Sequence, residues 1–323
     1  MALTIPSTLK LTSLKHIALK CGISNSGTKP ILTQRLHNEI SRAGQPGKQK
    51  PIRILSIDMG IRNLAYCILD TTPRGNAAPK HGQQLPTIQS WHRLAVSSAP
   101  PVPSAIIPPS DALKAKEVEK ESFTPATLSK TAYSLLRTRL LPCNPTHILI
   151  ERQRFRSMGS KHILEWTIRV NMFESILYAV LCTLRSEGIW EGTVEAIAPG
   201  KVGPFWVGEG EGTEVQVGDR KVRKAKSAKA QNKGAKIDLV RGWLDQGQMV
   251  RLGNDEVEGV ARAYREKWAR APGGGPAVKN DLGEKMGKLD DLADSLLQGM
   301  AWIEWEENKK IALKHGVEAL LEP

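Results

Sequence analysis

Two short apolar runs in the middle of the chain each end at an acidic residue. The run at 52–57 (IRILSI) leads into Asp58, and the run at 147–150 (HILI) leads into Glu151. Aliphatic and β-branched runs of this length predict buried strands. Further strands are predicted over residues 63–69, 90–96 and 193–197.

Helical patterns occupy the intervals between these strands. Thr124 followed by Pro125 predicts a helix start, because threonine caps a first turn and proline needs no backbone donor there. This helix is expected to end near residue 141. Strands that alternate with helices predict an α/β sheet with helices on its faces. Other helices are predicted over residues 160–187, 237–246 and 289–314.

The helix expected at 160–187 has an apolar arc wider than one core needs. We therefore expect part of it to face a second subunit. The arc consists of Ile163, Ile168, Met172, Phe173, Ile176, Leu177, Val180, Leu181 and Leu184.

Three segments lack a regular pattern. Proline clusters followed by a charged run predict a loop over 97–122. Residues 199–235 are expected to be irregular, with a basic insertion at about 203–235, and residues 271–287 begin with PGGGP and predict a second insertion. Between 220 and 236 there are eight Lys or Arg and no acid. Such a run is typical of a solvated loop or a nuclear address, but here we favour phosphate contact.

The N-terminal residues form a small unit of their own. A first helix is predicted around Leu11 and Leu14, with Gly22 placed to end it. The second helix has Ile31, Leu32, Leu36 and Ile40 on its apolar face.

This pattern resembles the SAP motif, a helix-extended-helix DNA-binding module. The resemblance makes Lys15 and Lys29 candidates for DNA contact. A helical hairpin that only packs on the main domain is the alternative. The segment AGQPGKQKP reads as a flexible basic linker, so we expect a module at 1–45 and a main domain at 51–323.

Charge and composition narrow the partners. The chain has 323 residues, 46 Lys or Arg and 33 Asp or Glu, giving a formal net charge of +13. That excess favours a polyanion, since Lys and Arg displace counterions from phosphates. We find no convincing basic amphipathic helix and expect no membrane partner. The four cysteines lack metal-ligand spacing, and Cys67 and Cys182 are expected to be buried thiols.

The acidic residues suggest the chemistry. Asp58, Glu151 and the cluster Asp290, Asp291 and Asp294 come from separate elements, and several carboxylates on one surface need a cation between them. Oxygen ligands without Cys or His suit Mg²⁺ or Mn²⁺, and two such ions per site would serve phosphoryl transfer.

Each acidic motif also has an ordinary explanation. Asp58 alone fits a turn, or the Asp-x-Gly of the actin and heat-shock ATPase fold. Glu151 alone could pair with Arg152 or Arg154, and the acids at 290–294 could favour a helix N-terminus through its dipole. An ATPase would need a second phosphate loop rich in Gly and Thr, which the segment at 147–157 is not.

Taken in order, the three motifs resemble a known superfamily. The segments IDMGIRNLAY, IERQRFRS and KLDDLADSLL are similar to the RuvC-type Holliday-junction resolvases of the ribonuclease H-like superfamily, above all the fungal mitochondrial branch. This resemblance implies a mixed sheet flanked by helices, and a mitochondrial homodimer that cuts four-way DNA junctions by paired symmetric nicks. The first 20 residues lack acids but also arginine, so a transit peptide is only weakly indicated.

Several basic residues are candidate DNA contacts. Clustered arginine around one aromatic suits phosphate clamping and base stacking, and Phe155 lies one residue later than the wedge phenylalanine of bacterial relatives. Phe155 could equally anchor its loop in the core. The segment around Lys201 and the later lysines resemble the family's basic active-site flank. The full set after Glu151 is Arg152, Gln153, Arg154, Phe155, Arg156, Lys201, Lys233 and Lys236.

Helix geometry ranks the two possible partners of Asp294. At about 100° per residue, Asp290 lies roughly 40° to one side of Asp294 and Asp291 roughly 60° to the other. Leu297 and Ala301 extend the apolar arc toward Asp290. We therefore expect Asp290 to lie near the metals and Asp291 to point more toward solvent, although the three-residue spacing of bacterial relatives favours Asp291.

Two other functions remain open. The chain could be another ribonuclease H-like nuclease that acts on RNA or RNA–DNA hybrids. It could also be a non-catalytic DNA-binding protein on the same fold, although the intact set of acids argues against this.

Overall fold

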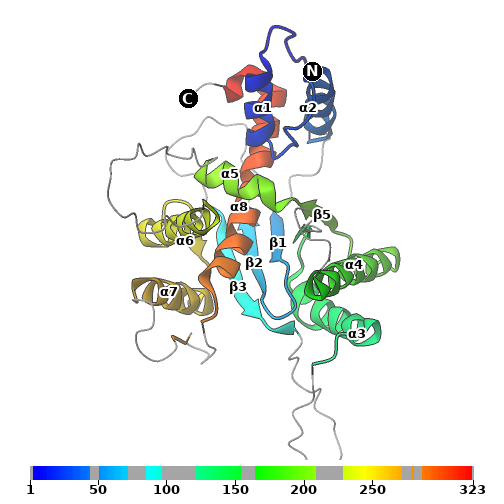
Figure 1. The fold of residues 1–323 in the computed structure, drawn as a ribbon, viewed down its shortest axis with the longest axis vertical. Helices are drawn as coiled ribbons and strands as arrows, with labels where there is room; N and C mark the ends of the chain where they lie inside the picture. Colours follow the sequence, from blue (N-terminus) through cyan, green and yellow to red (C-terminus); the bar gives the residue numbers. More distant parts are fainter. Residues whose placement is uncertain are drawn as a thin grey trace, which may run out of the picture.

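The computed structural model describes residues 3–43, 51–71, 85–96, 121–153, 164–208, 228–270, 278–279 and 286–321. Within these ranges a six-stranded sheet lies between two layers of helices (Figure 1). The strand order is β5-β4-β1-β2-β3-β6. The strands are β1 (Ile52–Asp58), β2 (Leu64–Thr71), β3 (Thr87–Leu94), β4 (His147–Glu151), β5 (Thr193–Ile197) and β6 (Arg251–Leu252).

The sheet is mixed, as the resemblance implied. β1 and β2 form an antiparallel hairpin that β3 continues, whereas β4 lies parallel to β1 on its other side and β5 parallel to β4. The predicted strands are confirmed, although β3 begins and ends earlier than the range 90–96. Because β1 and β4 run in the same direction, their last residues meet at one edge of the sheet.

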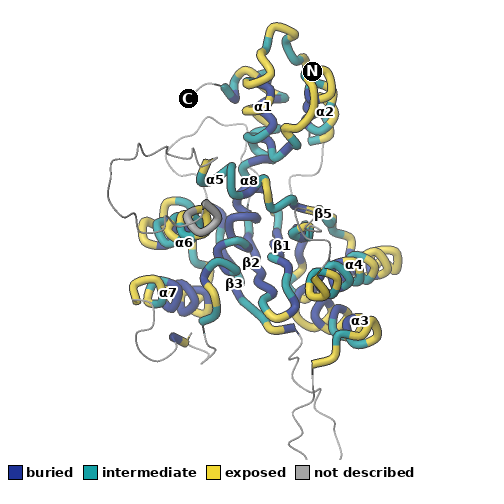
Figure 2. The backbone as a smooth tube through the Cα atoms, in the orientation of Figure 1, coloured by how far each residue is buried: buried dark blue, intermediate teal, exposed yellow. Residues whose placement is uncertain are grey.

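Helices cover both faces of the sheet. One face packs against α5 (Pro199–Val207), α6 (Ala228–Gln246), α7 (Asp255–Ala269) and α8 (Leu289–His315). The other packs against α3 (Pro125–Leu135) and α4 (Glu165–Ser186). After α3 the chain continues through a π-helical turn at Leu136–Leu140 and a 3₁₀ turn at Leu141–Cys143. The buried core therefore follows the strands and α8 (Figure 2).

Part of the segment predicted to be irregular is helical. α5 begins with Pro199 in its first turn, and its Phe205 and Trp206 pack against the core beside α8. α6 starts at Ala228, nine residues before the predicted start. α7, which begins after the Asn254 cap, was not predicted. The predicted loop at 97–122 lies almost entirely outside the described residues, as does most of the insertion at 271–287.

The N-terminal unit consists of two helices, as predicted. α1 (Leu11–Lys20) is followed after Cys21 by Gly22, which has a positive φ of 65°, and α2 (Lys29–Ala43) comes next. Both helices pack against the C-terminal half of α8 and the 3₁₀ turn η4 (Val317–Leu320) in one hydrophobic core (Figure 1). A Cβ at Gly22 would lie 2.2 Å from the ring of Trp305, so only glycine permits this close approach.

Two apolar residues are more exposed than predicted. Ile31 in α2 is 53% exposed, and the Cys182 thiol in α4 is exposed rather than buried. Among the described residues, α4 is one helix that is long and apolar enough to cross a membrane. Core helices of soluble proteins pass the same test, and the inner side of α4 packs on the sheet, so we give this property little weight.

Candidate active site

The alternation of strand residues places Asp58 and Glu151 on one face of the sheet. Leu55 and Ile57 of β1 point into the α3–α4 layer, and so do Ile148 and Ile150 of β4. Asp58 follows Ile57 and Glu151 follows Ile150, so both acids must point to the opposite face, which α8 covers. The parallel register pairs Ile57 with Ile150, so Asp58 and Glu151 follow as the next neighbours.

The two strand-end carboxyl groups interact directly. A side-chain hydrogen bond joins the carboxyl groups of Asp58 and Glu151. Burial, then the nearby charge of Glu151, raises the pKa of Asp58 well above its usual range. Burial is also the main reason that the pKa of Glu151 is raised. Two buried carboxyl groups in contact can share one proton.

The first turns of α8 bring the remaining acids to the same place. Burial raises the pKa values of Asp291 and Asp294, and the charge of Asp294 acts on both Asp58 and Glu151. Each acid of α8 meets a cation: Lys236 pairs with Asp294, Lys233 pairs with Asp290, and Arg93 Nε lies 2.9 Å from Asp291 Oδ2. The structure thus brings all five predicted acids into one charged cluster.

The expected difference in exposure between Asp290 and Asp291 is wrong. The two side chains are 16% and 15% exposed, so Asp291 does not point more toward solvent. Asp291 is also one of the charges that raise the pKa of Asp58, whereas Asp290 acts on Asp294 and pairs with Lys233. The prediction considered only the apolar arc of α8, but Arg93 on β3 and Lys233 on α6 decide what covers each carboxylate.

Two charged residues near the cluster were not predicted. Arg93 has no motif around it and lies in the middle of an ordinary strand pattern. Glu174 on α4 is only 9% exposed and accepts a hydrogen bond of 3.0 Å from the backbone N–H of Gln153, two residues after Glu151. The sequence held one signal for Glu174, an acid next to the apolar arc of a predicted helix. A buried carboxylate is costly unless it has a partner or a role.

The donor set fits a hard divalent cation in chemical type. Carboxylate oxygens from β1, β4 and α8 surround one region, with no Cys or His among them. Burial is the first cause of each raised pKa, so a bound cation would stabilise the charged form of these carboxylates. Within the described ranges, no three His, Cys, Asp or Glu side chains are in a geometry that holds a metal ion. In this arrangement Lys233 and Lys236 pair with Asp290 and Asp294.

The predicted DNA contacts form two groups. One group lies near the acids, and the other lies away from them. Arg152 is exposed next to Glu151, and Gln153 donates to Glu151 through a side-chain hydrogen bond of 3.2 Å. Lys233 and Lys236 are at the carboxylates, as described above. Arg154, Phe155 and Arg156 lie outside the described residues.

The other three predicted lysines lie in or against the N-terminal unit. Lys201 Nζ donates to the backbone oxygen of Gly22 at 2.6 Å and so ties α5 to the end of α1. Lys29 Nζ donates to Ser7 O at 2.7 Å, within the unit, while Lys15 is exposed on α1. Trp302 and Trp305 are 6% and 3% exposed, so both rings pack inside the protein.

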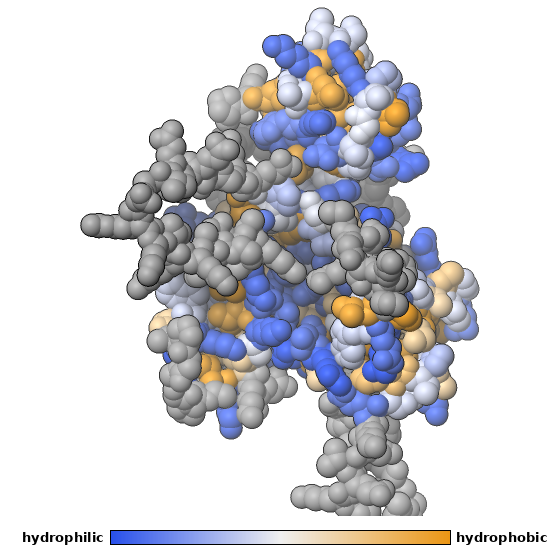
Figure 3. Space-filling model, in the orientation of Figure 1, coloured by the Kyte–Doolittle hydropathy of each residue, from blue (hydrophilic) through white to orange (hydrophobic). Residues whose placement is uncertain are grey.

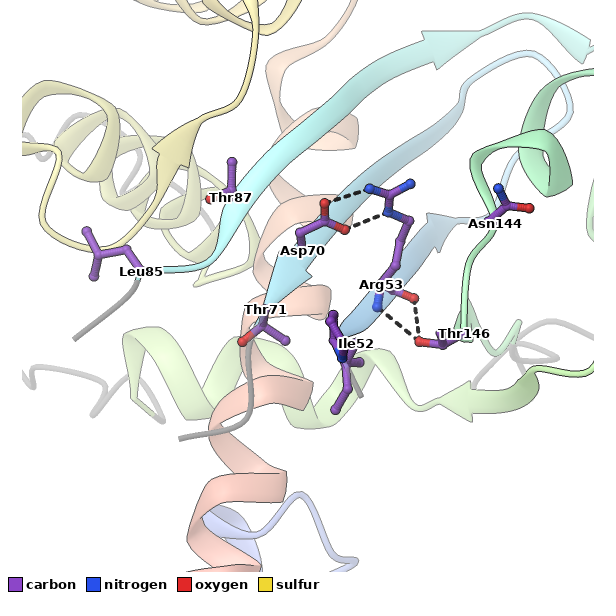
Figure 4. Close-up of a pocket in the computed structure, with 9 residues that line it drawn as sticks. Ile52, Arg53, Asp70, Thr71, Leu85, Thr87, Asn144 and Thr146 are labelled. Atoms are coloured by element: carbon purple, nitrogen blue, oxygen red, sulfur yellow. Dashed lines mark hydrogen bonds and ion pairs between the residues drawn. The ribbon is translucent and has the colours of Figure 1, made fainter. Parts of the chain in front are cut away.

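A hollow of about 380 Å³ lies at the opposite end of the strands (Figure 4). It is lined by the start of β1, the end of β2 and Thr146. Its polar groups bond to each other: the Arg53 guanidinium donates to both oxygens of Asp70 at 2.6 and 2.7 Å and to Cys143 O at 2.9 Å. This hollow therefore offers a ligand few free polar groups.

Comparisons with known proteins identify relatives of this chain. The cruciform cutting endonuclease 1, mitochondrial, of Schizosaccharomyces pombe is 27% identical over 309 residues, covering 94% of this chain and 95% of the relative. The protein of the same name in Saccharomyces cerevisiae is 24% identical over 328 residues, covering 93% of this chain and 82% of the relative. The crystal structure of the yeast mitochondrial Holliday junction resolvase Ydc2 matches with a TM-score of 0.60 and 25% identity, covering 97% of this chain and all of that one.

The family model described as mitochondrial resolvase Ydc2 / RNA splicing MRS1 matches residues 54–311, which span the sheet and most of α8. The predicted ribonuclease H-like fold class is confirmed by the structural match. The chain therefore belongs to the mitochondrial resolvase Ydc2 / RNA splicing MRS1 family.

Proposed function

We propose that this protein is a mitochondrial Holliday-junction resolvase that nicks four-way DNA junctions by metal-assisted hydrolysis. One observation carries the proposal: Asp58, Glu151 and the acids of α8 converge on one face of the sheet, surrounded by lysine and arginine. Its relatives are named cruciform cutting endonucleases of mitochondria, which supports both the substrate and the compartment.

Asp58, Glu151, Asp294 and Asp291 would hold two Mg²⁺ or Mn²⁺ ions. We choose Asp291 over Asp290 because the charge of Asp291 is one of those that raise the pKa of Asp58. When bound, such ions supply Lewis-acid stabilisation of the attacking and leaving oxygens of a phosphodiester. The Gln153 amide orients the Glu151 carboxylate through their hydrogen bond. Lys236 and Lys233 bring positive charge to the same carboxylates, where a DNA phosphate would meet it.

The direct test offers the full chain labelled four-way junction, linear duplex and RNA–DNA hybrid, with Mg²⁺ and with EDTA. We expect paired nicks in the junction only, and only with Mg²⁺. Hybrid cleavage without junction cleavage would show the other nuclease activity. Tight junction binding without cleavage under any divalent ion would show a binding protein instead.

The family description gives one reason to keep an RNA-binding alternative, since it includes RNA splicing. An RNA-binding member would not need the buried carboxyl pair, which lowers stability unless it is used. Competition for the protein between a structured RNA and the junction therefore separates the two functions. A preference for RNA by tenfold or more would favour the splicing role.

We propose that α4 contributes to a two-fold dimer interface, since paired nicks need two active sites. Its outer side exposes Leu164 at 63% and Ile168 at 49%. Figure 3 shows apolar side chains over α3 and α4 on the visible face. Light scattering at micromolar concentration should give a dimer for the wild type and a monomer for Ile168→Glu. The control is Ile311→Glu, at an apolar residue 37% exposed near the far end of α8.

We propose that the N-terminal unit binds DNA as a SAP-like module. Deleting residues 1–45 is a poor test, because Ala312, Val317 and Leu320 would lose the apolar partners that bury them. A Lys10→Gln, Lys15→Gln double variant keeps the packing, since both side chains are exposed. It should weaken junction binding and reduce the salt slope by about one for each lost phosphate contact. Lys130→Gln on α3 is the matched control.

A further inference from the structure

A buried glutamine connects the three elements that carry the acids. Gln298 lies one helical turn after Asp294 on α8 and is only 3% exposed. Its Nε2 lies 3.1 Å from Ser56 Oγ, 3.2 Å from Ile57 O and 3.4 Å from Leu149 O. A buried amide is costly unless it is hydrogen-bonded, and here its donor group is satisfied by two different strands.

The acceptors of Gln298 lie next to the proposed ligands. Ile57 directly precedes Asp58 on β1, and Leu149 is two residues before Glu151 on β4. Because an amide nitrogen carries two hydrogens, it can bond to both strands at once. A single side chain thus ties the helix that carries Asp294 to the strands that carry the other two carboxyl groups.

The backbone of α8 is also close to the sheet at this point. A Cβ at Gly299 would lie 2.7 Å from Leu69 Cδ1 and 3.2 Å from the Cβ of Ser56. The absence of a side chain at Gly299 lets the helix approach β1 and β2. The Gln298 bonds then fix its position along the strands, which apolar packing alone specifies weakly.

The carboxylates provide the reason for such a tether. Without a cation they repel each other, and that repulsion favours any motion that separates α8 from β1 and β4. We propose that Gln298 is a positioning residue that holds the carboxylate-bearing elements at the separation divalent cations require. This inference rests on the proposed function, because it assumes that these carboxylates bind metal.

The test is the Mn²⁺ affinity of the full-length, DNA-free protein by calorimetry. Gln298→Met keeps the length of the side chain and removes the donor. It should lower Mn²⁺ affinity about tenfold or more, the usual effect of losing a residue that orients metal ligands. The Mg²⁺ concentration for half-maximal junction cleavage should rise in parallel, and high Mg²⁺ should restore most of the rate. Junction binding in EDTA should not change.

Ser295→Ala is the matched control on the same helix. Ser295 is fully buried, but its hydroxyl donates to Leu292 O at 2.9 Å within α8, so this variant should leave metal affinity unchanged. If Gln298→Met does not fold, Ser56→Ala removes one acceptor and should lower Mn²⁺ affinity about twofold.

Two outcomes separate this inference from the proposed function. If Asp58→Asn loses Mn²⁺ binding while folded Gln298→Met, or Ser56→Ala in its place, binds as tightly as the wild type, the positioning role is wrong. If Asp58→Asn itself binds Mn²⁺ like the wild type, the assignment of the metal site is wrong.

Discussion

Asp58 and Asp70 lie on neighbouring strands and have opposite surroundings. The β1–β2 register places Arg53 opposite Asp70, and the guanidinium donates to both carboxylate oxygens (Figure 4). The same register places Ala65 opposite Asp58, whose carboxyl group bonds to another acid, Glu151. One end of the sheet thus has an acid with its own arginine, and the other has an acid pair without one.

This difference distinguishes a structural acid from a functional one. A bidentate arginine pair satisfies a carboxylate within the fold and leaves little for a ligand to do. A buried carboxyl pair with a raised pKa lowers stability unless something from outside binds it. Lysines from α6 partly supply that charge through Asp290 and Asp294, and a flexible lysine can be displaced more readily than a paired arginine.

Substitutions of the two neighbouring acids of α8, Asp290 and Asp291, should change the cleavage rate by very different amounts. Asp291→Asn should lower the cleavage rate at moderate Mg²⁺ about a hundredfold, because its charge belongs to the Asp58 group. Asp290→Asn should cost less than about tenfold, since it removes only the partner of Lys233. Nicking rates of a labelled junction measure both, and the reverse order would return Asp290 to the metal site.

Much of this site could be predicted from the sequence. The positions of Asp58 and Glu151 at strand ends followed from the aliphatic and β-branched runs that precede them. The cations could not be found in the same way. Arg93 reaches Asp291 from a strand with no motif, and Lys233 lies at Asp290 only because α6 begins earlier than its pattern indicated.

The expected difference in exposure between Asp290 and Asp291 was wrong for a related reason. A helical wheel shows which side of α8 is apolar, but the exposure of a residue at its first turn depends on what other elements place over it. Long-range contacts of this kind are set by tertiary packing and leave no local pattern. Lys201 is a similar case, because its partner Gly22 lies in a different part of the chain.

The lysines at the acid cluster should behave differently from Arg53. Lys236→Gln removes the cation from Asp294, so DNA-free protein should bind Mn²⁺ several-fold more tightly. Cleavage should nevertheless fall about tenfold, because a positive charge near the phosphate is lost. Calorimetry and nicking rates measure the two effects. Weaker Mn²⁺ binding in this variant would contradict the view that lysine and metal compete.

Breaking the structural pair should affect stability alone. Asp70→Asn removes the bidentate bond to Arg53, whose side chain is 36% exposed, so solvent already screens the pair. We expect a loss of about 1–2 kcal/mol in the free energy of unfolding. Urea denaturation measures it, and the cleavage rate per folded molecule should stay that of the wild type. A collapse of activity in stable protein would make Asp70 functional.

The smallest effect has the opposite sign. In EDTA, Asp58→Asn should raise the free energy of unfolding by about 1 kcal/mol at neutral pH, because it removes a buried, repelled carboxylate. A raised pKa means that the folded state holds its proton to higher pH. The gain should therefore be absent below the usual carboxyl pKa of about 4 and grow as pH rises. Urea titrations at several pH values would show this trend, and a loss of stability would contradict it.

We infer that the acid pair of Asp58 and Glu151 performs the chemistry and that Asp70, which is paired with Arg53, does not. The most direct measurement is Mg²⁺-dependent nicking of a labelled four-way junction by Asp58→Asn and Glu151→Gln, with Asp70→Asn as the control. We expect the first two variants to lose at least about a thousandfold in rate while still binding the junction in EDTA, and the control to cut normally. Cleavage by Asp58→Asn within about tenfold of the wild-type rate would contradict it.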